Sequence, residues 1–252
     1  MSKKRTLTIM LTLLVAVCLL ATTALAAVVP STPSMPSAPS GATAPSTPDN
    51  PTAPSQPSQP SQPSQPSEPE LKFIDVNEGD WFYNSVMWAV KNGVTVGTTP
   101  TTFEPYTACT RAQMIEFLWN AVGKPAATIK SVPFTDVPES GSDDYWYEDS
   151  LLWAYEAGIV AGTNDGSTFS PDQVCTRAEM ISFIARLLSD GATADMPFVD
   201  VPASAWYYNE VQWAWANGLT VGTNDGTTFS PDNACIRAEA VEFLYNAFAE
   251  VE

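Results

Sequence analysis

The chain contains three copies of one sequence unit, and this repetition limits its fold more than any other feature. The stretch Cys-Thr-Arg-Ala-Gln-Met at 109–114 returns as Cys-Thr-Arg-Ala-Glu-Met at 175–180 and as Cys-Ile-Arg-Ala-Glu-Ala at 235–240. A unit that recurs at a period of about sixty residues is one supersecondary element that has been copied. We therefore predict three repeats, at residues 71–130, 131–195 and 196–252.

Each unit is predicted to hold two helices joined by a loop. It opens with Phe-x-Asp-Val. A helix follows that begins at a Trp and ends at a Gly in the left-handed conformation. The unit then reaches Phe-x-Pro, where the Pro prevents a helix. The second helix begins in the recurring stretch. Thr110 with Gln113, and Thr176 with Glu179, form capping boxes, whereas Ile236 has no hydroxyl to accept a backbone hydrogen bond.

The fold class predicted from this pattern is mostly α. Neither helix of a unit could bury its apolar face alone, so three units must share one core. This favours a pseudo-threefold helical domain with short extended segments and loops.

The composition excludes several kinds of function. The chain has a formal net charge of -17 and contains no His. Catalysis by Ser-His-Asp or Cys-His groups and metal binding by imidazole are therefore excluded. The acidic balance also argues against nucleic acid as a partner, because a phosphate backbone requires clustered Lys and Arg.

The N-terminus is predicted to be a secretory signal peptide at 1–26. Basic residues at 3–5 precede an apolar run at 7–20, and Ala24-Leu25-Ala26 provides a cleavage site of small residues. Cleavage would change the net charge from -17 to -20 and leave no contact with the membrane. The alternative is an uncleaved membrane anchor, since the run to Val29 is nearly long enough to span a bilayer.

Residues 27–70 are rich in Pro, Ser and Gln and cannot form a packed core. Proline at every third position between 57 and 69 matches the three-residue turn of polyproline II. We predict a disordered or semi-rigid spacer, with a surface partner that the sequence does not identify. A flexible, O-glycosylated tail is the alternative.

Cys109, Cys175 and Cys235 occupy one repeat position, where we expect three buried thiols that behave as small hydrophobes. Disulfide pairing and a three-thiolate metal site are the alternatives. The Asn-Asp-Gly loops at 164–166 and 224–226 are compatible with calcium, but they are also ordinary turns, and the first repeat has Thr-Thr-Pro instead. No metal or cofactor is predicted, and calcium dependence stays open.

Three of the four arginines that follow residue 26 share one position at the start of the second helix. They are Arg111, Arg177 and Arg237. Because a helix N-terminus already has a positive potential, Arg at this position favours recognition of an anion such as a carboxylate. The alternative is structural pairing with Asp75, Asp136 or Asp200, or with a carboxylate of a neighbouring repeat.

Taken together, these motifs resemble S-layer homology domains over residues 71–252. The resemblance implies a three-pronged helical spindle that binds secondary cell-wall polysaccharide noncovalently in grooves between prongs, often through pyruvylated sugars. Carried over by position, it makes the three arginines groove residues. The other candidate ligand-binding residues are Trp81, Trp146, Trp206, Gly97, Gly162, Gly222, Asp75, Asp136 and Asp200. The chain departs from the family signature at Gln113, in place of Glu, and at Ile236, in place of Thr.

We therefore predict an exported, non-enzymatic anchoring protein in the cell wall or S-layer of a bacterium. The alternatives are a small carbohydrate-active enzyme with paired carboxylates and a lectin-like adhesive surface protein. If the helix cap orders each arginine, Arg177 contributes most to binding and Arg237 least.

Overall fold

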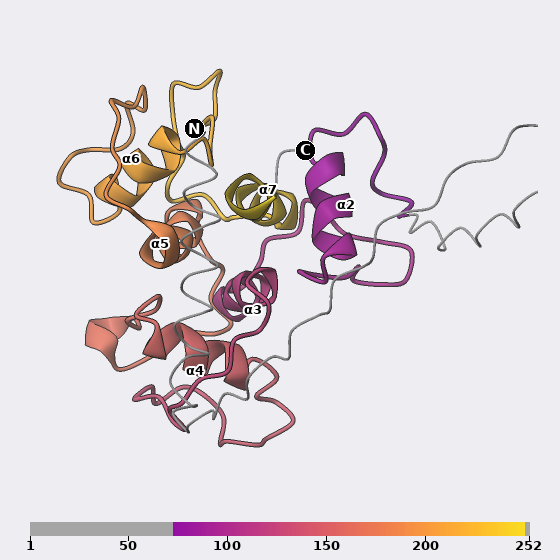
Figure 1. Cartoon of the computed structure of the whole chain (residues 1–252), viewed down its shortest axis with the longest axis vertical. Coiled ribbons are helices and arrows are strands. Elements are labelled where there is room, and N and C mark those ends of the chain that lie inside the picture. The colour runs from indigo at the N-terminus through magenta and orange to yellow at the C-terminus, as the bar shows by residue number, and fades with distance from the viewer. Residues whose placement is uncertain (1–72, 250–252) are drawn as a thin grey trace, which may run out of the picture. The chain divides into compact units, whose positions relative to one another are not determined.

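The computed structural model describes residues 73–249, so the predicted signal peptide at 1–26 and the spacer at 27–70 lie outside the described residues. Between residues 73 and 249 the regular elements are six α-helices and one 3-10 helix, without a strand, which confirms the mostly helical class. Each repeat has two α-helices. They are α2 (Tyr83–Lys91) and α3 (Arg111–Ala121), α4 (Glu148–Glu156) and α5 (Arg177–Leu188), and α6 (Tyr208–Ala216) and α7 (Arg237–Phe248), with η1 (Asn164–Gly166) between α4 and α5 (Figure 1).

The first helix of each repeat ends as the sequence predicts. Gly93 follows α2 with φ of 66°, and its N–H donates to the carbonyl of Val90 at 3.1 Å. The next N–H, from Val94, donates to the carbonyl of Ala89 at 2.8 Å. This pair of bonds is the Schellman motif, which requires a left-handed residue at the position of the Gly. Gly158 and Gly218 have the same conformation, with φ of 71° and 73°.

The start of these helices differs from the prediction. We expected each helix to begin at the Trp, but α2 begins at Tyr83 and Trp81 lies in the preceding turn with its side chain 57% exposed. The core position is taken by the next residue, Phe82, which is 1% exposed. The Trp is thereby left on the surface, because only one aromatic ring enters the core at this point.

The second helices begin with the predicted caps. The Thr176 hydroxyl accepts from the N–H of Glu179 at 3.2 Å, and the Glu179 carboxylate accepts from the N–H of Thr176 at 2.8 Å. Thr110 and Gln113 form the same reciprocal pair. In the third repeat Ile236 has no hydroxyl, yet α7 begins at the equivalent residue and spans 12 residues, as α5 does. The missing cap does not shift the helix start.

A closed cycle of backbone hydrogen bonds joins the three repeats immediately before their second helices. The N–H of Cys109 donates to the carbonyl of Cys235 at 3.1 Å, that of Cys175 to Cys109 at 2.9 Å, and that of Cys235 to Cys175 at 2.9 Å. All three cysteines are free and fully buried, which confirms the prediction of buried thiols. The cycle holds the starts of α3, α5 and α7 next to one another.

The helices pack between repeats rather than within them. Helix α3 packs against α4, α5 against α6, and α2 against α7, while α3, α5 and α7 also contact one another (Figure 1). Each first helix therefore covers the second helix of another repeat. A repeat on its own would leave both of its apolar faces exposed.

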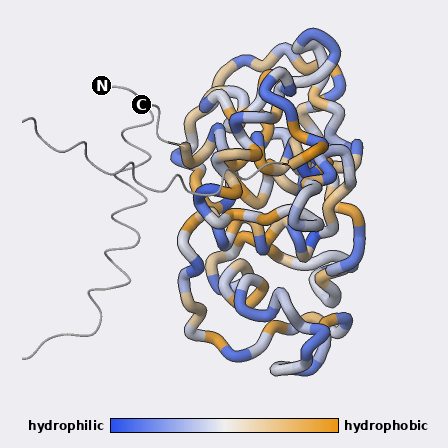
Figure 2. Tube along the Cα trace, turned by 90° about the vertical axis from the view of Figure 1, so that its right-hand side faces the viewer, coloured by the Kyte–Doolittle hydropathy of each residue, from blue (hydrophilic) through white to orange (hydrophobic). Residues whose placement is uncertain are grey.

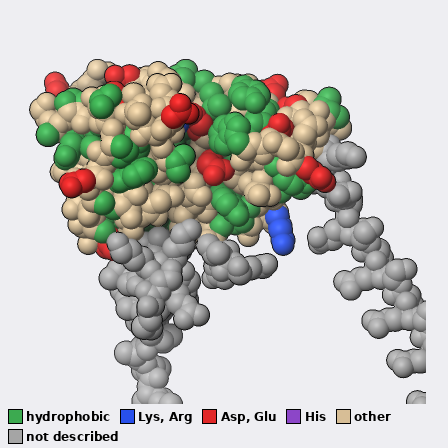
Figure 3. Space-filling view, turned by 90° about the horizontal axis from the view of Figure 1, so that it is seen from above, with side chains coloured by type: hydrophobic (Ala, Val, Ile, Leu, Met, Phe, Trp, Pro, Cys, Tyr) green, Lys and Arg blue, Asp and Glu red, His purple; other side chains and the backbone are tan. Residues whose placement is uncertain are grey.

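The core is formed from residues throughout the described part of the chain, and hydrophobic positions recur along the whole trace (Figure 2). Phe103, Phe169 and Phe229 of the three Phe-x-Pro segments are each 0% exposed. Full burial of a Phe side chain contributes about 1.5–3 kcal/mol to folding. On the face drawn in Figure 3, Asp and Glu side chains are scattered between hydrophobic ones, and very little Lys or Arg surface is visible. None of the helices described between residues 73 and 249 is long and apolar enough to cross a membrane.

Candidate functional site

The three Asp candidates bind backbone donors of their own repeats. Asp136 Oδ1 accepts from the N–H of Phe169 at 2.8 Å, and Oδ2 accepts from the N–H of Ser170 at 2.7 Å. Asp75 and Asp200 make the equivalent bonds to the Phe-x-Pro segments of the first and third repeats. Each carboxylate thus fastens the opening of a repeat to its Phe-x-Pro loop, and ligand binding by these residues remains a prediction.

The three Gly candidates lie against aromatic rings. A Cβ atom on Gly162 would lie 2.6 Å from Cε1 of Phe134, and one on Gly97 would lie 2.6 Å from Cε1 of Phe73. At Gly222 the corresponding distance, to Cε1 of Phe198, is 2.4 Å. A side chain at these positions would displace a buried ring, so packing alone requires Gly here.

The guanidinium of Arg111 is buried between the first and second repeats. Its side chain is 4% exposed, and Nη1 donates to Glu179 Oε1 at 2.6 Å. Nε donates to the carbonyl of Phe169 at 2.9 Å, and Cζ lies 5.2 and 5.4 Å from the ring centroids of Phe169 and Phe183. Of the two structural alternatives, pairing with a carboxylate of the neighbouring repeat is the one present. No residue in the described part of the chain accepts a hydrogen bond from Nη2, so this nitrogen is a free donor.

Arg177 repeats this arrangement between the second and third repeats. Nη1 donates to Glu239 Oε1 at 2.6 Å, and Nε donates to the carbonyl of Phe229 at 2.9 Å. The Cζ atom lies 4.9 Å from the ring centroid of Phe229 and 5.2 Å from that of Phe243. The second guanidinium is therefore neutralised in the same way as the first.

Arg237, between the third and first repeats, lacks the ion pair. Nε donates to the carbonyl of Phe103 at 2.8 Å and Nη2 to that of Val96 at 2.9 Å, but no carboxylate among residues 73–249 lies within ion-pair distance. The residue equivalent to Glu179 is Gln113, which carries no charge. Arg237 is 6% exposed, and burial lowers the pKa of its guanidinium from the usual 12.5. The charge is thus buried without a carboxylate partner in this part of the chain, and carbonyl oxygens accept from Nε and Nη2.

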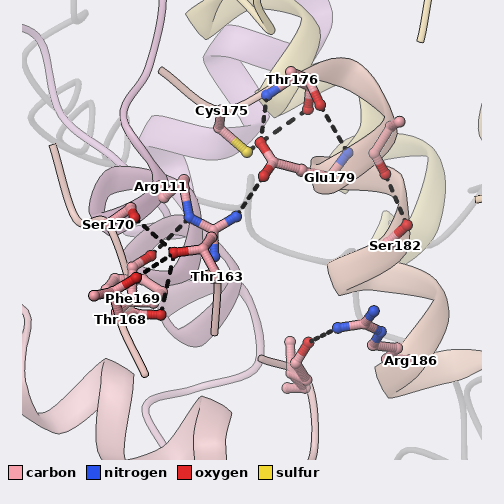
Figure 4. A network of polar contacts seen from close by, with 12 residues as sticks. Arg111, Thr163, Thr168, Phe169, Ser170, Cys175, Thr176, Glu179, Ser182 and Arg186 are labelled. Carbon is pink, nitrogen blue, oxygen red and sulfur yellow. Dashed lines mark hydrogen bonds and ion pairs between the residues drawn. The ribbon is translucent and has the colours of Figure 1, made fainter. Parts of the chain in front are cut away.

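A pocket of about 190 Å³ brings together candidate residues from all three repeats. Figure 4 labels five of its lining residues, which are Arg111, Thr163, Glu179, Ser182 and Arg186. Arg111 comes from the first repeat, Gly162 from the second and Trp206 from the third. The remaining lining residues are Ala161, Thr163, Glu179, Ser182, Phe183 and Arg186. Trp206 is 58% exposed, so its indole ring stands open to solvent at the edge of the pocket. Asp136 is not among the lining residues.

Arg186 is the one functional candidate in this pocket that sequence reasoning missed. It is exposed, and Nη1 donates to the carbonyl of Ile159 at 3.0 Å. Asn120 and Asn246 occupy the equivalent positions and donate to the equivalent carbonyls of Val94 and Leu219. A signal was available, because Arg186 is the fourth arginine after residue 26 and the only one outside the shared repeat position.

A second, more open pocket of about 410 Å³ is formed by the loop at 221–226 and includes Gly222. Asn224 and Asp225 in this loop, like Asn164 and Asp165, have left-handed backbone angles, with φ between 45° and 59°. Turn chemistry accounts for this conformation. Between residues 73 and 249, no group of three or more Cys, Asp or Glu side chains is placed to hold a metal ion.

Comparison with known proteins identifies the class. The sequence profile of the S-layer homology domain matches residues 72–115, 133–181 and 197–241, more than half of the chain, one segment in each predicted repeat. The chain therefore belongs to the S-layer homology domain family.

Several surface proteins and enzymes share part of this sequence. A cell surface protein of Thermoanaerobacter kivui is 35% identical over 133 residues, which are 50% of this chain and 16% of that protein. A surface-layer 125 kDa protein of Lysinibacillus sphaericus is 34% identical over 93 residues, 37% of this chain and 8% of that protein. An endoglucanase of Bacillus sp. (strain KSM-635) is 33% identical over 114 residues, 45% of this chain and 11% of the enzyme. The chain thus matches less than a fifth of the length of each of these relatives.

Proposed function

We propose that this protein is an exported anchor of a bacterial cell surface that binds secondary cell-wall polysaccharide noncovalently. Membership of the S-layer homology domain family and the surface-layer relatives support surface anchoring in general. Binding of a pyruvylated or otherwise anionic glycan is our more specific proposal.

The observation that carries it is the pocket that joins Arg111, Gly162 and Trp206. The free Nη2 of a buried guanidinium is a planar, charged donor suited to a carboxylate. The exposed indole ring of Trp206 offers an apolar face on which a sugar ring can lie, and exposed large aromatic groups beside a pocket are typical of binding sites. At about 190 Å³ the pocket is smaller than the roughly 300 Å³ or more that encloses a drug-sized ligand, so it suits a terminal unit of a longer polymer.

We also propose that the three repeats form the pseudo-threefold, three-pronged spindle of the family. The closed cycle of cysteine hydrogen bonds and the packing of helices between repeats support this arrangement. We call the pocket of Arg111, Gly162 and Trp206 the first groove. The equivalent residues one repeat further on are Arg177, Gly222 and Trp81, which would form the second groove. Arg237, Gly97 and Trp146 would form the third, in agreement with the bond from Arg237 to the carbonyl of Val96 beside Gly97.

The two rival functions receive less support. The endoglucanase relative aligns with this chain over only 114 residues, 11% of its own length, so the likeness lies in the repeats rather than in a whole enzyme. A lectin-like adhesive role depends on the spacer at 27–70, which is outside the described residues. We propose that the signal peptide at 1–26 directs export and that the spacer holds the repeats away from another surface component.

Cosedimentation of the purified protein with wall sacculi, before and after chemical removal of the secondary polymer, tests the proposal. We expect binding to intact sacculi and loss of binding once the polymer is removed. Equal binding to both preparations would contradict polymer recognition. Release of reducing sugar from the sacculi would favour the enzyme, and glycan attached to the spacer would favour the adhesive role.

A pair of variants tests the pocket itself. Trp206 is exposed, so Trp206→Ala should weaken sedimentation while leaving the helical circular dichroism unchanged. Trp206→Phe keeps an aromatic ring and should retain most of the binding. Equal binding by the Ala variant and the wild type would exclude the ring from the site.

A further inference from the structure

The three grooves differ in charge, although their central arginines are equivalent. In the first groove Arg111 is neutralised by Glu179, and Arg186 adds a positive charge that no described carboxylate pairs with. Ser182, which also lines this pocket, is neutral. The first groove therefore has an excess positive charge.

The second groove has the opposite character. Arg177 is neutralised by Glu239, the residue equivalent to Ser182 is Glu242, and the residue equivalent to Arg186 is Asn246. Asn246 Nδ2 lies 3.3 Å from Glu242 Oε1, so the two side chains occupy the same region. This groove has an excess negative charge, which repels an anionic ligand.

The third groove is intermediate in charge between the first and the second. Gln113 leaves Arg237 without a counter-charge, but the residue equivalent to Ser182 is Glu116 and the residue equivalent to Arg186 is Asn120. Each central arginine leaves one terminal nitrogen without a described acceptor, Nη1 in Arg237 and Nη2 in Arg111. The third groove therefore differs from the first in having no excess positive charge and no guanidinium equivalent to that of Arg186.

Building on the anionic-glycan function proposed above, we propose that Arg186 is the specificity-determining residue of this chain and makes the first groove its principal binding site. The acidic group of the ligand, a carboxylate or a phosphate, lies between two guanidinium groups that different repeats supply. Arg111 contributes Nη2 from the first repeat, and Arg186 contributes Nε and Nη2 from the second. The chain has a formal net charge of -17, so a local pair of guanidinium groups is a place on its surface where anions are attracted.

The charges of the three grooves rank the arginines in a different order from the helix caps. If the helix caps decided affinity, Arg177 would contribute most to ligand binding, because its own Thr176–Glu179 box is complete. If the charge of the groove decides affinity, Arg111 contributes most and Arg177 least. The difference arises because Glu179 and Arg186 of the second repeat face the arginine of the first repeat and not their own.

The test is isothermal titration calorimetry of the full chain with secondary polymer extracted from the producing cells. The decisive variant is Arg186→Asn, the residue present at 120 and 246. Asn at those positions still donates to the carbonyl equivalent to that of Ile159, so the substitution removes the charge and keeps the structural hydrogen bond. We expect affinity to fall about tenfold, as for loss of one charge-assisted contact, and to become less sensitive to salt.

Two further variants serve as controls. Arg186→Lys keeps the charge and should retain most of the affinity, and Asn246→Arg places a cation in the second groove and should strengthen binding. Reduction of the polymer's carboxylates to alcohols identifies the acidic group, since binding that survives reduction indicates phosphate. If the wild type binds and Arg186→Asn binds equally well, the role of Arg186 is wrong while the proposed function stands. If the wild type does not bind the polymer, the proposed function fails as well.

Discussion

Glu179 holds Arg111 of the preceding repeat with one carboxylate oxygen and caps its own helix with the other. Oε1 accepts from Arg111 Nη1 at 2.6 Å, and Oε2 accepts from the N–H of Thr176 at 2.8 Å. A single residue thus satisfies one backbone donor at the start of α5 and neutralises a buried guanidinium 68 residues earlier in the sequence. Gln113 retains the capping bond but cannot neutralise a cation.

We expect Gln113→Glu to stabilise the protein. The new carboxylate would keep its bond to the N–H of Thr110 and supply the ion pair that Arg237 lacks. Pairing a buried charge that is now unmatched should raise the free energy of unfolding by about 1–3 kcal/mol. Urea denaturation measures this difference. The matched control is Glu179→Gln, which removes the equivalent ion pair and should lower the free energy of unfolding. A Gln113→Glu variant that is less stable than the wild type would contradict this explanation.

Local features of the fold could be predicted from the sequence because they depend on neighbouring residues. The two capping boxes, the left-handed Gly at the end of each first helix and the buried thiols all follow from short motifs. The position of Trp81 before α2 was predicted wrongly, since periodicity does not decide which of two adjacent aromatic rings enters the core.

The contacts between repeats could not be predicted in the same way. The sequence left two kinds of structural partner open for Arg111, namely the Asp residues at 75, 136 and 200 or a carboxylate of a neighbouring repeat. Only the docking of one repeat on the next selects Glu179. The same docking brings Arg186 to the pocket of Arg111. Sequence motifs carry no information on which repeat faces which, because all three repeats present the same pattern.

The buried thiols should be inert at neutral pH. Burial raises the pKa of Cys109 from 9.0 to about 11, against the lowering influence of Arg237, and burial also raises the pKa of Cys175 and Cys235. The thiolate is the reactive form, so alkylation at pH 8 should be slow in the native protein and complete in urea. Mass spectrometry after timed alkylation measures this, and a disulfide between any two of these cysteines would contradict it.

The raised pKa of Cys109 makes the free energy of unfolding depend on pH in the alkaline range. An unfolded Cys ionises near pH 9, whereas folded Cys109 stays protonated until about pH 11. Below pH 9 both states are protonated and the contribution to stability is fully present, and as pH rises from about 9 to 11 the unfolded state loses protons and is favoured. The urea midpoint should therefore fall across this range. Replacing Cys109 with Ala should reduce that fall, because the titrating group is removed.

Gly162→Ala should destabilise the protein through both backbone and packing. Gly162 has φ of 82°, and an added Cβ would lie 2.6 Å from Cε1 of Phe134 and 2.7 Å from the carbonyl oxygen of Thr168. Gly191→Ala is the matched control, because Gly191 has φ of 78° but no atom within 4 Å of the added Cβ. The backbone strain is similar in both, so Gly162→Ala should cost about 1–3 kcal/mol more. Equal melting temperatures for the two variants would mean that Phe134 moves aside freely.

Replacing Ile236 separates the effect of the helix cap from the effect of groove charge. Thr and Val have nearly the same shape, so comparison of Ile236→Thr with Ile236→Val isolates the hydroxyl that would accept from the N–H of Glu239. The Thr variant should be more stable by about 1 kcal/mol, the usual contribution of an N-cap hydroxyl. Its affinity for the wall polymer should match that of the Val variant, because the first groove contains no part of this cap. If the Thr variant instead binds the polymer much more tightly, ordering of Arg237 by the cap determines affinity, and the charge supplied by Arg186 does not.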